Sequence, residues 1–127
     1  ALPGSEVPQG LNEADKEFLE KLLAVITAEL NNPELDSSHL ETKMAISRMQ
    51  LYRKIKTISG MTPAEFIRNI RLQKAAELLA TTRLTVSEIF FQTGFNNQSY
   101  FFREFKKKYQ YSPNEYRLAR MTRIAPE

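Results

Sequence analysis

Two stretches of the chain carry arginine and lysine side chains that recur at helical spacing on one face. The first stretch spans residues 47–60 and the second spans residues 97–110. An arginine lies near the middle of the polar face in each, Arg53 in the first and Arg103 in the second. A guanidinium donates paired hydrogen bonds in one plane, and the O6 and N7 atoms of guanine accept such a pair. These residues are therefore suited to binding a negatively charged partner that presents many hydrogen-bond acceptors.

The rest of the chain offers no set of residues typical of catalysis. The sequence has no cysteine and a single histidine, His39, so it holds no evident nucleophile–base pair and no metal-ligand cluster. A glycine-rich phosphate loop is also missing from the sequence. His39 follows two serines, where a surface or capping role is the simpler interpretation. We therefore expect no catalytic residues, no metal and no cofactor.

Charge is divided unequally along the chain. Residues 1–41 contain two basic and nine acidic residues, a net charge of −7, whereas residues 42–127 contain sixteen and six, a net charge of +10. Such a basic segment is typical of nucleic-acid binding, although a solvated basic face would also account for it. The longest apolar run, Leu22 to Ile26, is far shorter than the roughly 20 residues of a membrane span. With no cysteine present, we expect a cytoplasmic segment without membrane contact.

Capping signals divide the chain into about seven helices and predict no strand. Residues that can cap a helix N-terminus precede each apolar-periodic segment, and these are Asn12, Asp36, Ser47, Thr62, Thr85, Asn97 and Ser112. Gly60 ends the first basic helix, and Asn31-Asn32-Pro33 is expected to end the first helix. The predicted organisation is a linker at 1–11, an N-terminal amphipathic helix at 12–33, a first module at 34–61, a connecting helix at 62–80, and a second module with a C-terminal helix at 81–123.

The two modules repeat each other. An offset of 50 aligns Ser47 with Asn97 and Arg53 with Arg103, whereas an offset of 49 aligns Ala45 with Gly94. One extra residue in the second turn explains the difference. Each copy is a short helix, a tight turn and a longer basic helix, which is the order of a helix-turn-helix motif whose second helix enters the DNA major groove. The sequence thus predicts an all-α, homeodomain-like fold with two helix-turn-helix modules joined by a central linker helix.

The residues at these positions form a recognisable pattern. The second module carries Gly94-Phe95, Ser99-Tyr100-Phe101, Arg103, Phe105-Lys106, Ser112-Pro113 and Glu115-Tyr116-Arg117. The first carries Ser47-Arg48 and Leu51-Tyr52-Arg53-Lys54, with Ile70-Arg71-Leu72, Ala75-Ala76 and Leu78-Leu79 on the connecting helix. Over roughly residues 20–118 the chain resembles the DNA-binding domain of the AraC/XylS family of bacterial transcription regulators. The acidic first helix resembles the segment that joins such domains to the receiver part of hybrid two-component sensor-regulators.

Four positions depart from the family pattern. Glu41 and Phe90 stand where the family usually has a small residue, and Ala45 and Gln110 stand where it usually has glycine. A residue with a Cβ atom is less free to adopt positive φ. We therefore expect the first turn to differ slightly from the family shape.

The helical wheel separates inward from outward residues on each basic helix. Two outward stripes correspond at offset 50: Met49, Tyr52, Arg53 and Lys56 on the first helix, and Ser99, Phe102, Arg103 and Lys106 on the second. The resemblance places base-reading residues on these stripes. Candidate base-reading residues are Met49, Gln50, Tyr52, Arg53, Gln98, Ser99, Phe102 and Arg103. Candidate phosphate contacts are Arg48, Lys54, Lys56, Lys106 and Lys107. Tyr52 and Phe102 suit contact with a thymine methyl group and packing over the turn equally well.

Two functional interpretations follow for this non-enzyme. The first is sequence-specific binding of double-stranded DNA, as the output domain of a longer bacterial regulator with RNA polymerase as a candidate partner. An activator role and a repressor role both stay open. Dimerisation of that regulator is left open. The alternative is a helical protein-interaction module that uses its aromatic residues and binds DNA weakly.

Overall fold

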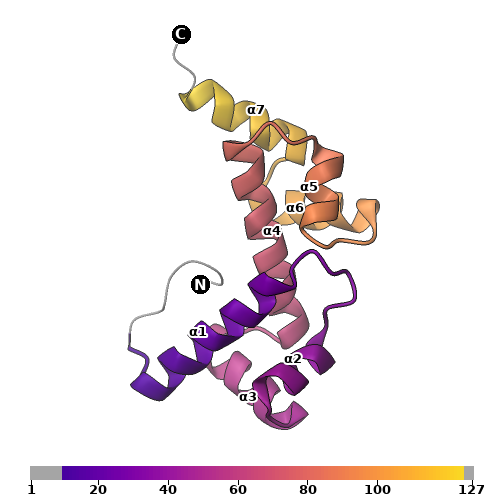
Figure 1. The fold of residues 1–127 in the computed structure, drawn as a ribbon. Helices are drawn as coiled ribbons and strands as arrows, with labels where there is room; N and C mark the ends of the chain where they lie inside the picture. Colours follow the sequence, from indigo (N-terminus) through magenta and orange to yellow (C-terminus); the bar gives the residue numbers. More distant parts are fainter. Residues whose placement is uncertain (1–9, 125–127) are drawn as a thin grey trace. The chain divides into compact units, whose positions relative to one another are not determined.

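The structure, a computed structural model, describes residues 10–124, and this part of the chain is all-α (Figure 1). Its seven helices are α1 (Glu13–Ala28), α2 (Ser37–Met44), α3 (Arg48–Ser59), α4 (Pro63–Thr81), α5 (Val86–Gln92), α6 (Gln98–Tyr109) and α7 (Pro113–Ile124). The predicted all-α class and helix order are confirmed. Of the linker predicted at 1–11, only Gly10 and Leu11 lie within the described residues.

Side-chain caps begin the helices at the predicted residues. Asn12, Asp36 and Asn97 each accept a hydrogen bond from the backbone N–H three residues later. Reciprocal caps, in which the third residue also accepts from the cap N–H, join Ser47 with Gln50, Thr62 with Glu65, Thr85 with Glu88, and Ser112 with Glu115. The hydrogen bond from the backbone of Thr62 lowers the pKa of Glu65, and that from Ser112 lowers the pKa of Glu115.

Helix α1 ends earlier than its sequence predicts. The expected end was Asn31-Asn32-Pro33, but the regular helix stops at Ala28. Tighter turns replace the α-helical pattern there, because the backbone N–H of Glu29 bonds to Ile26 and that of Leu30 bonds to Thr27. These turns bury Leu30, which is 7% exposed, against the core.

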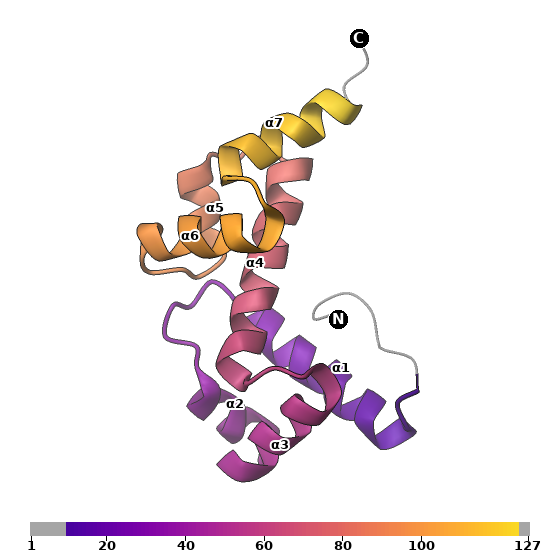
Figure 2. The same cartoon turned by 180° about the vertical axis from the view of Figure 1, so that it is seen from behind.

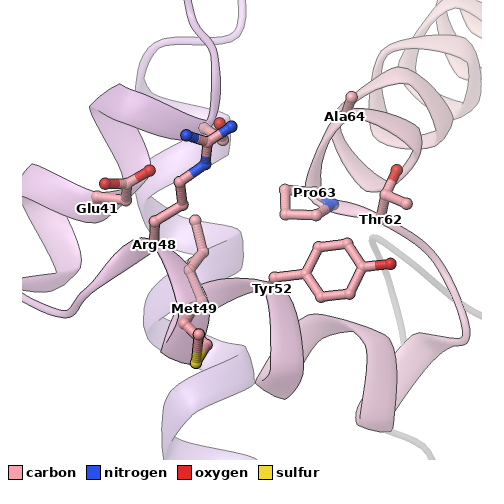
Figure 3. A pocket seen from close by; sticks show the side chains of 9 residues that line it. Glu41, Arg48, Met49, Tyr52, Thr62, Pro63 and Ala64 are labelled. Atoms are coloured by element: carbon pink, nitrogen blue, oxygen red, sulfur yellow. The ribbon is translucent and has the colours of Figure 1, made fainter.

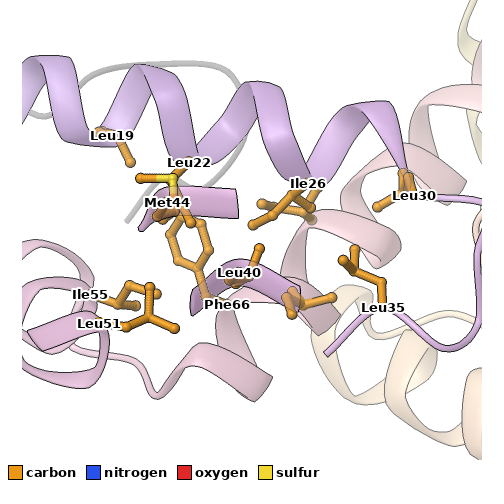
Figure 4. Packing of buried hydrophobic residues seen from close by; sticks show 12 residues of the cluster. Leu19, Leu22, Ile26, Leu30, Leu35, Leu40, Met44, Leu51, Ile55 and Phe66 are labelled. Atoms are coloured by element: carbon orange, nitrogen blue, oxygen red, sulfur yellow. The ribbon is translucent and has the colours of Figure 1, made fainter. Parts of the chain in front are cut away.

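The chain divides into two compact units between Ile70 and Arg71, within α4. In the first unit α1 packs on α2 and α2 packs on α3. Figure 4 shows Leu22 and Ile26 of α1 beside Leu40 of α2 and Phe66 of α4, and all four are buried. The amphipathic first helix thus docks on the first module.

The second unit has a core of its own, built mostly from aromatic residues. Figures 1 and 2 show α5 and α6 gathered against the C-terminal part of α4, and α6 packs on α7. Phe101 and Phe105 of α6 are fully buried among Leu79 and Ile89. Helix α4 thus supplies apolar residues to both cores. No helix within residues 10–124 is both long enough and apolar enough to cross a membrane.

Candidate nucleic-acid interface

The turns that precede α3 and α6 close with the same pair of backbone hydrogen bonds. After α2, the N–H groups of Ala45 and Ile46 bond to the carbonyls of Thr42 and Glu41, at 3.3 and 3.2 Å. After α5, the N–H groups of Gly94 and Phe95 bond to the carbonyls of Phe91 and Phe90, at 3.1 and 3.4 Å. All four partners correspond at offset 49, and the pattern is a Schellman motif. The two turns are therefore equivalent at their starts.

The turns differ by one residue in their second halves. Only Ile46 lies between Ala45 and the helix cap at Ser47, whereas two residues lie between Gly94 and the cap at Asn97. The offset accordingly changes from 49 to 50 within the turn. The predicted single extra residue is confirmed.

Positive φ angles occur at matching positions of both modules. Ala45 has φ 57° and its counterpart Gly94 has φ 81°, while Gly60 has φ 76° and its counterpart Gln110 has φ 71°. Ala45 thus adopts the left-handed conformation that glycine adopts in the second turn, so its Cβ atom does not prevent the Schellman closure. The closing hydrogen bonds hold the backbone there.

Each basic helix buries one apolar side in the core of its unit. Leu51 and Ile55 of α3 are buried, as are Phe101 and Phe105 of α6. The residues of both outward stripes, Met49, Tyr52, Arg53 and Lys56 with Ser99, Phe102, Arg103 and Lys106, are exposed. Each unit thus presents one polar and basic helix face to solvent.

The two central arginines have different surroundings. Arg53 is exposed on α3. Arg103 lies with its guanidinium carbon 5.4 Å from the centroid of the Tyr100 ring and its Nε 3.8 Å from a carboxylate oxygen of Glu104. The Arg103 side chain is 65% exposed, so these contacts orient it only weakly and leave it available to a partner.

Some candidate contact residues have partners within the chain. The side-chain oxygen of Gln50 accepts the Ser47 N–H at 3.2 Å as part of the helix cap. The ammonium of Lys56 donates to the carbonyl of Gly60 at 3.1 Å, and that of Lys54 lies 5.4 Å from the centroid of the Phe18 ring on α1. The other candidates near the helix ends, Arg48, Gln98, Ser99, Lys106 and Lys107, are exposed.

A pocket of about 530 Å³ opens beside the outward stripe of α3 (Figure 3). Its lining comes from three helices and the loop before α4: Ser37, Glu41, Arg48, Met49, Leu51, Tyr52, Thr62, Pro63 and Ala64. Figure 3 shows the Tyr52 ring next to Pro63. The sequence placed Met49 and Tyr52 on this face but did not indicate Pro63 or Ala64, because the start of α4 reaches α3 only through the tertiary fold.

A buried arginine on the connecting helix forms a hydrogen bond with the turn before α6. Arg71 of α4 is 6% exposed, and its Nη1 donates to the backbone carbonyl of Thr93 at 2.7 Å. Burial lowers the pKa of Arg71. The sequence carries a signal for this role, because Arg71 is four residues from both Ile67 and Ala75 and so lies on the buried face of α4.

Several known proteins resemble this chain. A family model described as a helix-turn-helix domain matches residues 40–119. A protein named histidine kinase P4 from Formosa agariphila is 34% identical over 106 residues, which cover 84% of this chain and 8% of that protein. The transcriptional regulator MtrA from Neisseria gonorrhoeae is 42% identical over 72 residues, which cover 57% of this chain and 24% of MtrA.

A solved structure also matches most of the chain. The C-terminal domain of the two-component response regulator yesN from Fusobacterium nucleatum aligns with a TM-score of 0.71 and 32% identity. The alignment covers 80% of this chain and 98% of that domain. This chain thus spans less than a quarter of the two curated relatives but nearly all of an isolated regulator domain. The chain belongs to the AraC/XylS-type helix-turn-helix family of DNA-binding domains that regulate transcription.

Proposed function

We propose that α3 and α6 read two successive major-groove segments of one DNA duplex, separated by about one helical turn, or roughly 10 base pairs. The observation that carries this proposal is the pair of outward stripes, which correspond at offset 50 and follow turns with the same hydrogen bonds. Their residues differ, so the DNA site is asymmetric.

The proposed roles follow from side-chain chemistry. Arg53 and Arg103 each bond to a guanine, since a guanidinium matches its O6 and N7 atoms. The further base-reading residues are Met49, Gln50, Tyr52, Gln98, Ser99 and Phe102. The phosphate contacts are Arg48, Lys54, Lys56, Lys106 and Lys107. Gln50, Lys54 and Lys56 make contacts within the chain. On binding DNA, each of these side chains breaks that contact or keeps it alongside the contact with DNA.

We further propose that this segment is the non-catalytic output domain of a longer two-component regulator. The names of the kinase and response-regulator relatives support this placement. Because its target is chromosomal DNA, the segment works in the bacterial cytoplasm. We also propose that the parent regulator forms a dimer and activates transcription through contact with RNA polymerase.

A protein-interaction module is the second candidate function. The observation that favours it is a set of exposed apolar side chains outside the outward stripes, namely Phe91 on α5 and Leu118 and Met121 on α7. Such residues mark protein contacts when they form a continuous patch. Binding of DNA with little dependence on salt would favour this function over the first.

A salt titration tests DNA binding. After selection of a preferred duplex from random sequences, its affinity should fall with salt at a log–log slope of about −5 if about six phosphates are neutralised. Lys107→Ala should make the log–log slope about 1 less negative and should weaken binding to all duplexes alike. Lys21→Ala on α1 removes the same charge outside the proposed surface and should leave the slope unchanged. A wild-type slope near zero would contradict the proposal.

A further inference from the structure

Two large apolar side chains interrupt the polar face of α3. Met49 is 67% exposed and Tyr52 is 48% exposed, although both lie on the outward stripe with Arg53 and Lys56. Neither supports the core, whose α3 contribution comes from Leu51 and Ile55. Side chains of this size exposed within a basic stripe are suited to an apolar group of a charged partner.

The second module lacks an equivalent pair. Ser99 replaces Met49 at offset 50, and Phe102 replaces Tyr52. The Phe102 ring lies 5.6 Å, centroid to centroid, from the buried Phe101 ring. Phe102 is thus an exposed aromatic counterpart of Tyr52, but it has no apolar neighbour at the Ser99 position. An apolar contact site made by two outward residues is specific to α3.

The pocket beside α3 shows how the apolar pair is arranged. Met49 and Tyr52 line it together with Pro63 and Ala64 from the start of α4 (Figure 3). Arg48 lies on the same pocket, and Arg53 follows Tyr52 on the exposed side of the helix. The apolar part of the pocket thus lies at the stripe, and one carboxylate, that of Glu41, lines the pocket with Arg48. With Arg53, cations outnumber this acid around the apolar pair, which favours an apolar group carried by a polyanion.

We propose that Met49 and Tyr52 bind the C5-methyl group of a thymine, next to the guanine that Arg53 contacts. This inference rests on the proposed function. The thymine methyl is the apolar group that a base pair exposes in the major groove, so it matches both the side chains and their charged surroundings. The pocket, at about 530 Å³, exceeds the size of a methyl group, so it admits this group without rearrangement of its lining.

Helix geometry limits the position of this thymine. Residues of an α-helix rise about 1.5 Å each, so Tyr52 and Met49 lie about 1.5 and 6 Å from Arg53 along the axis of α3. Successive base pairs are about 3.4 Å apart. The thymine therefore lies within about two base pairs of the guanine.

Replacement of thymine by uracil provides the test, because it removes only the methyl group. Each thymine of the selected duplex is replaced singly, and the full chain is titrated against every duplex. Loss of one buried methyl corresponds to about a fourfold weaker affinity. We expect this loss at one or two thymines near the guanine read by Arg53, and no loss at thymines outside the site.

Variants of the chain connect the methyl effect to the two side chains. Met49→Ala should bind the thymine duplex more weakly and should lose most of the difference between thymine and uracil, as a double-mutant cycle measures. Tyr52→Phe keeps the ring and should retain the difference, whereas Tyr52→Ala should reduce it. Ser87→Ala, at an exposed position of α5 outside the proposed DNA surface, is the control and should leave the difference intact. Both Met49 and Tyr52 are exposed, and melting curves check that each variant folds.

The outcomes separate this inference from the proposed function. A chain that selects a specific duplex but binds its uracil forms equally well would overturn the inference alone. The same conclusion follows if Met49→Ala and Tyr52→Ala both keep the full methyl effect. A chain that binds no duplex above background would overturn the proposed function, and the inference with it.

Discussion

Ala45 and Gln110 occupy left-handed backbone positions at which their counterparts in the other module are glycines. An L-residue in this conformation costs about 1–2 kcal/mol, whereas glycine adopts it without strain. Gln110 offsets part of this cost, because its side-chain amide donates to the carbonyl of Lys107 at 3.1 Å. No side-chain hydrogen bond is open to Ala45, so the first turn retains the strain.

Glycine at position 45 should therefore stabilise the protein. We expect Ala45→Gly to raise the free energy of unfolding by about 0.5–1 kcal/mol, measured by urea denaturation. Gly60→Ala is the matched reverse change, and it should lower the free energy of unfolding by about 1 kcal/mol. A Cβ atom at Gly60 would meet no other atom within 4 Å, so its effect reports backbone strain alone. Destabilisation by Ala45→Gly would contradict this interpretation.

At the residue scale, helix caps and stripe positions could be predicted, but side-chain partners could not. A cap such as Ser47 with Gln50 is a local pattern of three residues, which the sequence displays directly. The contact of Lys54 with Phe18 depends on the docking of α1 against α3, which no local pattern specifies. The sequence therefore indicates a phosphate contact for Lys54 but not its contact with Phe18.

Among the helices, α4 contacts the turn between α5 and α6 through Arg71. The Thr93 carbonyl that Arg71 contacts belongs to a fully buried residue, and Thr93 lies 22 positions away in the sequence. A buried carbonyl that loses its donor keeps its full desolvation cost. Arg71 therefore stabilises the turn that sets the direction in which α6 begins.

Replacement of Arg71 should destabilise the second unit. We expect Arg71→Met to lower the free energy of unfolding by about 1–3 kcal/mol, because the Thr93 carbonyl loses its partner within the core. Arg83→Met, at an exposed position after α4, is the control and should change stability by less than about 0.5 kcal/mol. Equal stability of the two variants in urea would show that the buried hydrogen bond contributes nothing.

Element starts were predicted more accurately than element ends. All seven helices begin after the predicted caps, because each start is marked by a specific side chain. The end of α1 was predicted three residues late, because burial of Leu30 through tighter turns depends on the core that forms around it. Arg71 was recognised only as part of a family pattern, since its partner lies in another element.

For the whole molecule, the central claim is that the two modules read DNA independently. The duplication supports this claim, because each unit has its own core, its own turn and its own outward stripe. Independent reading requires that each arginine specify a different base pair. If both modules contacted the same DNA segment, or if they supplied only positive charge, the two arginines would not specify different base pairs.

A base-by-base specificity profile of the wild-type chain, Arg53→Ala and Arg103→Ala tests the claim most directly. Each variant should lose about 1–3 kcal/mol of affinity for the selected duplex and lose base preference at one position. The two positions should lie about one helical turn, or roughly 10 base pairs, apart. Loss of preference at the same position in both variants, or a uniform loss of affinity with an intact profile, would contradict the account.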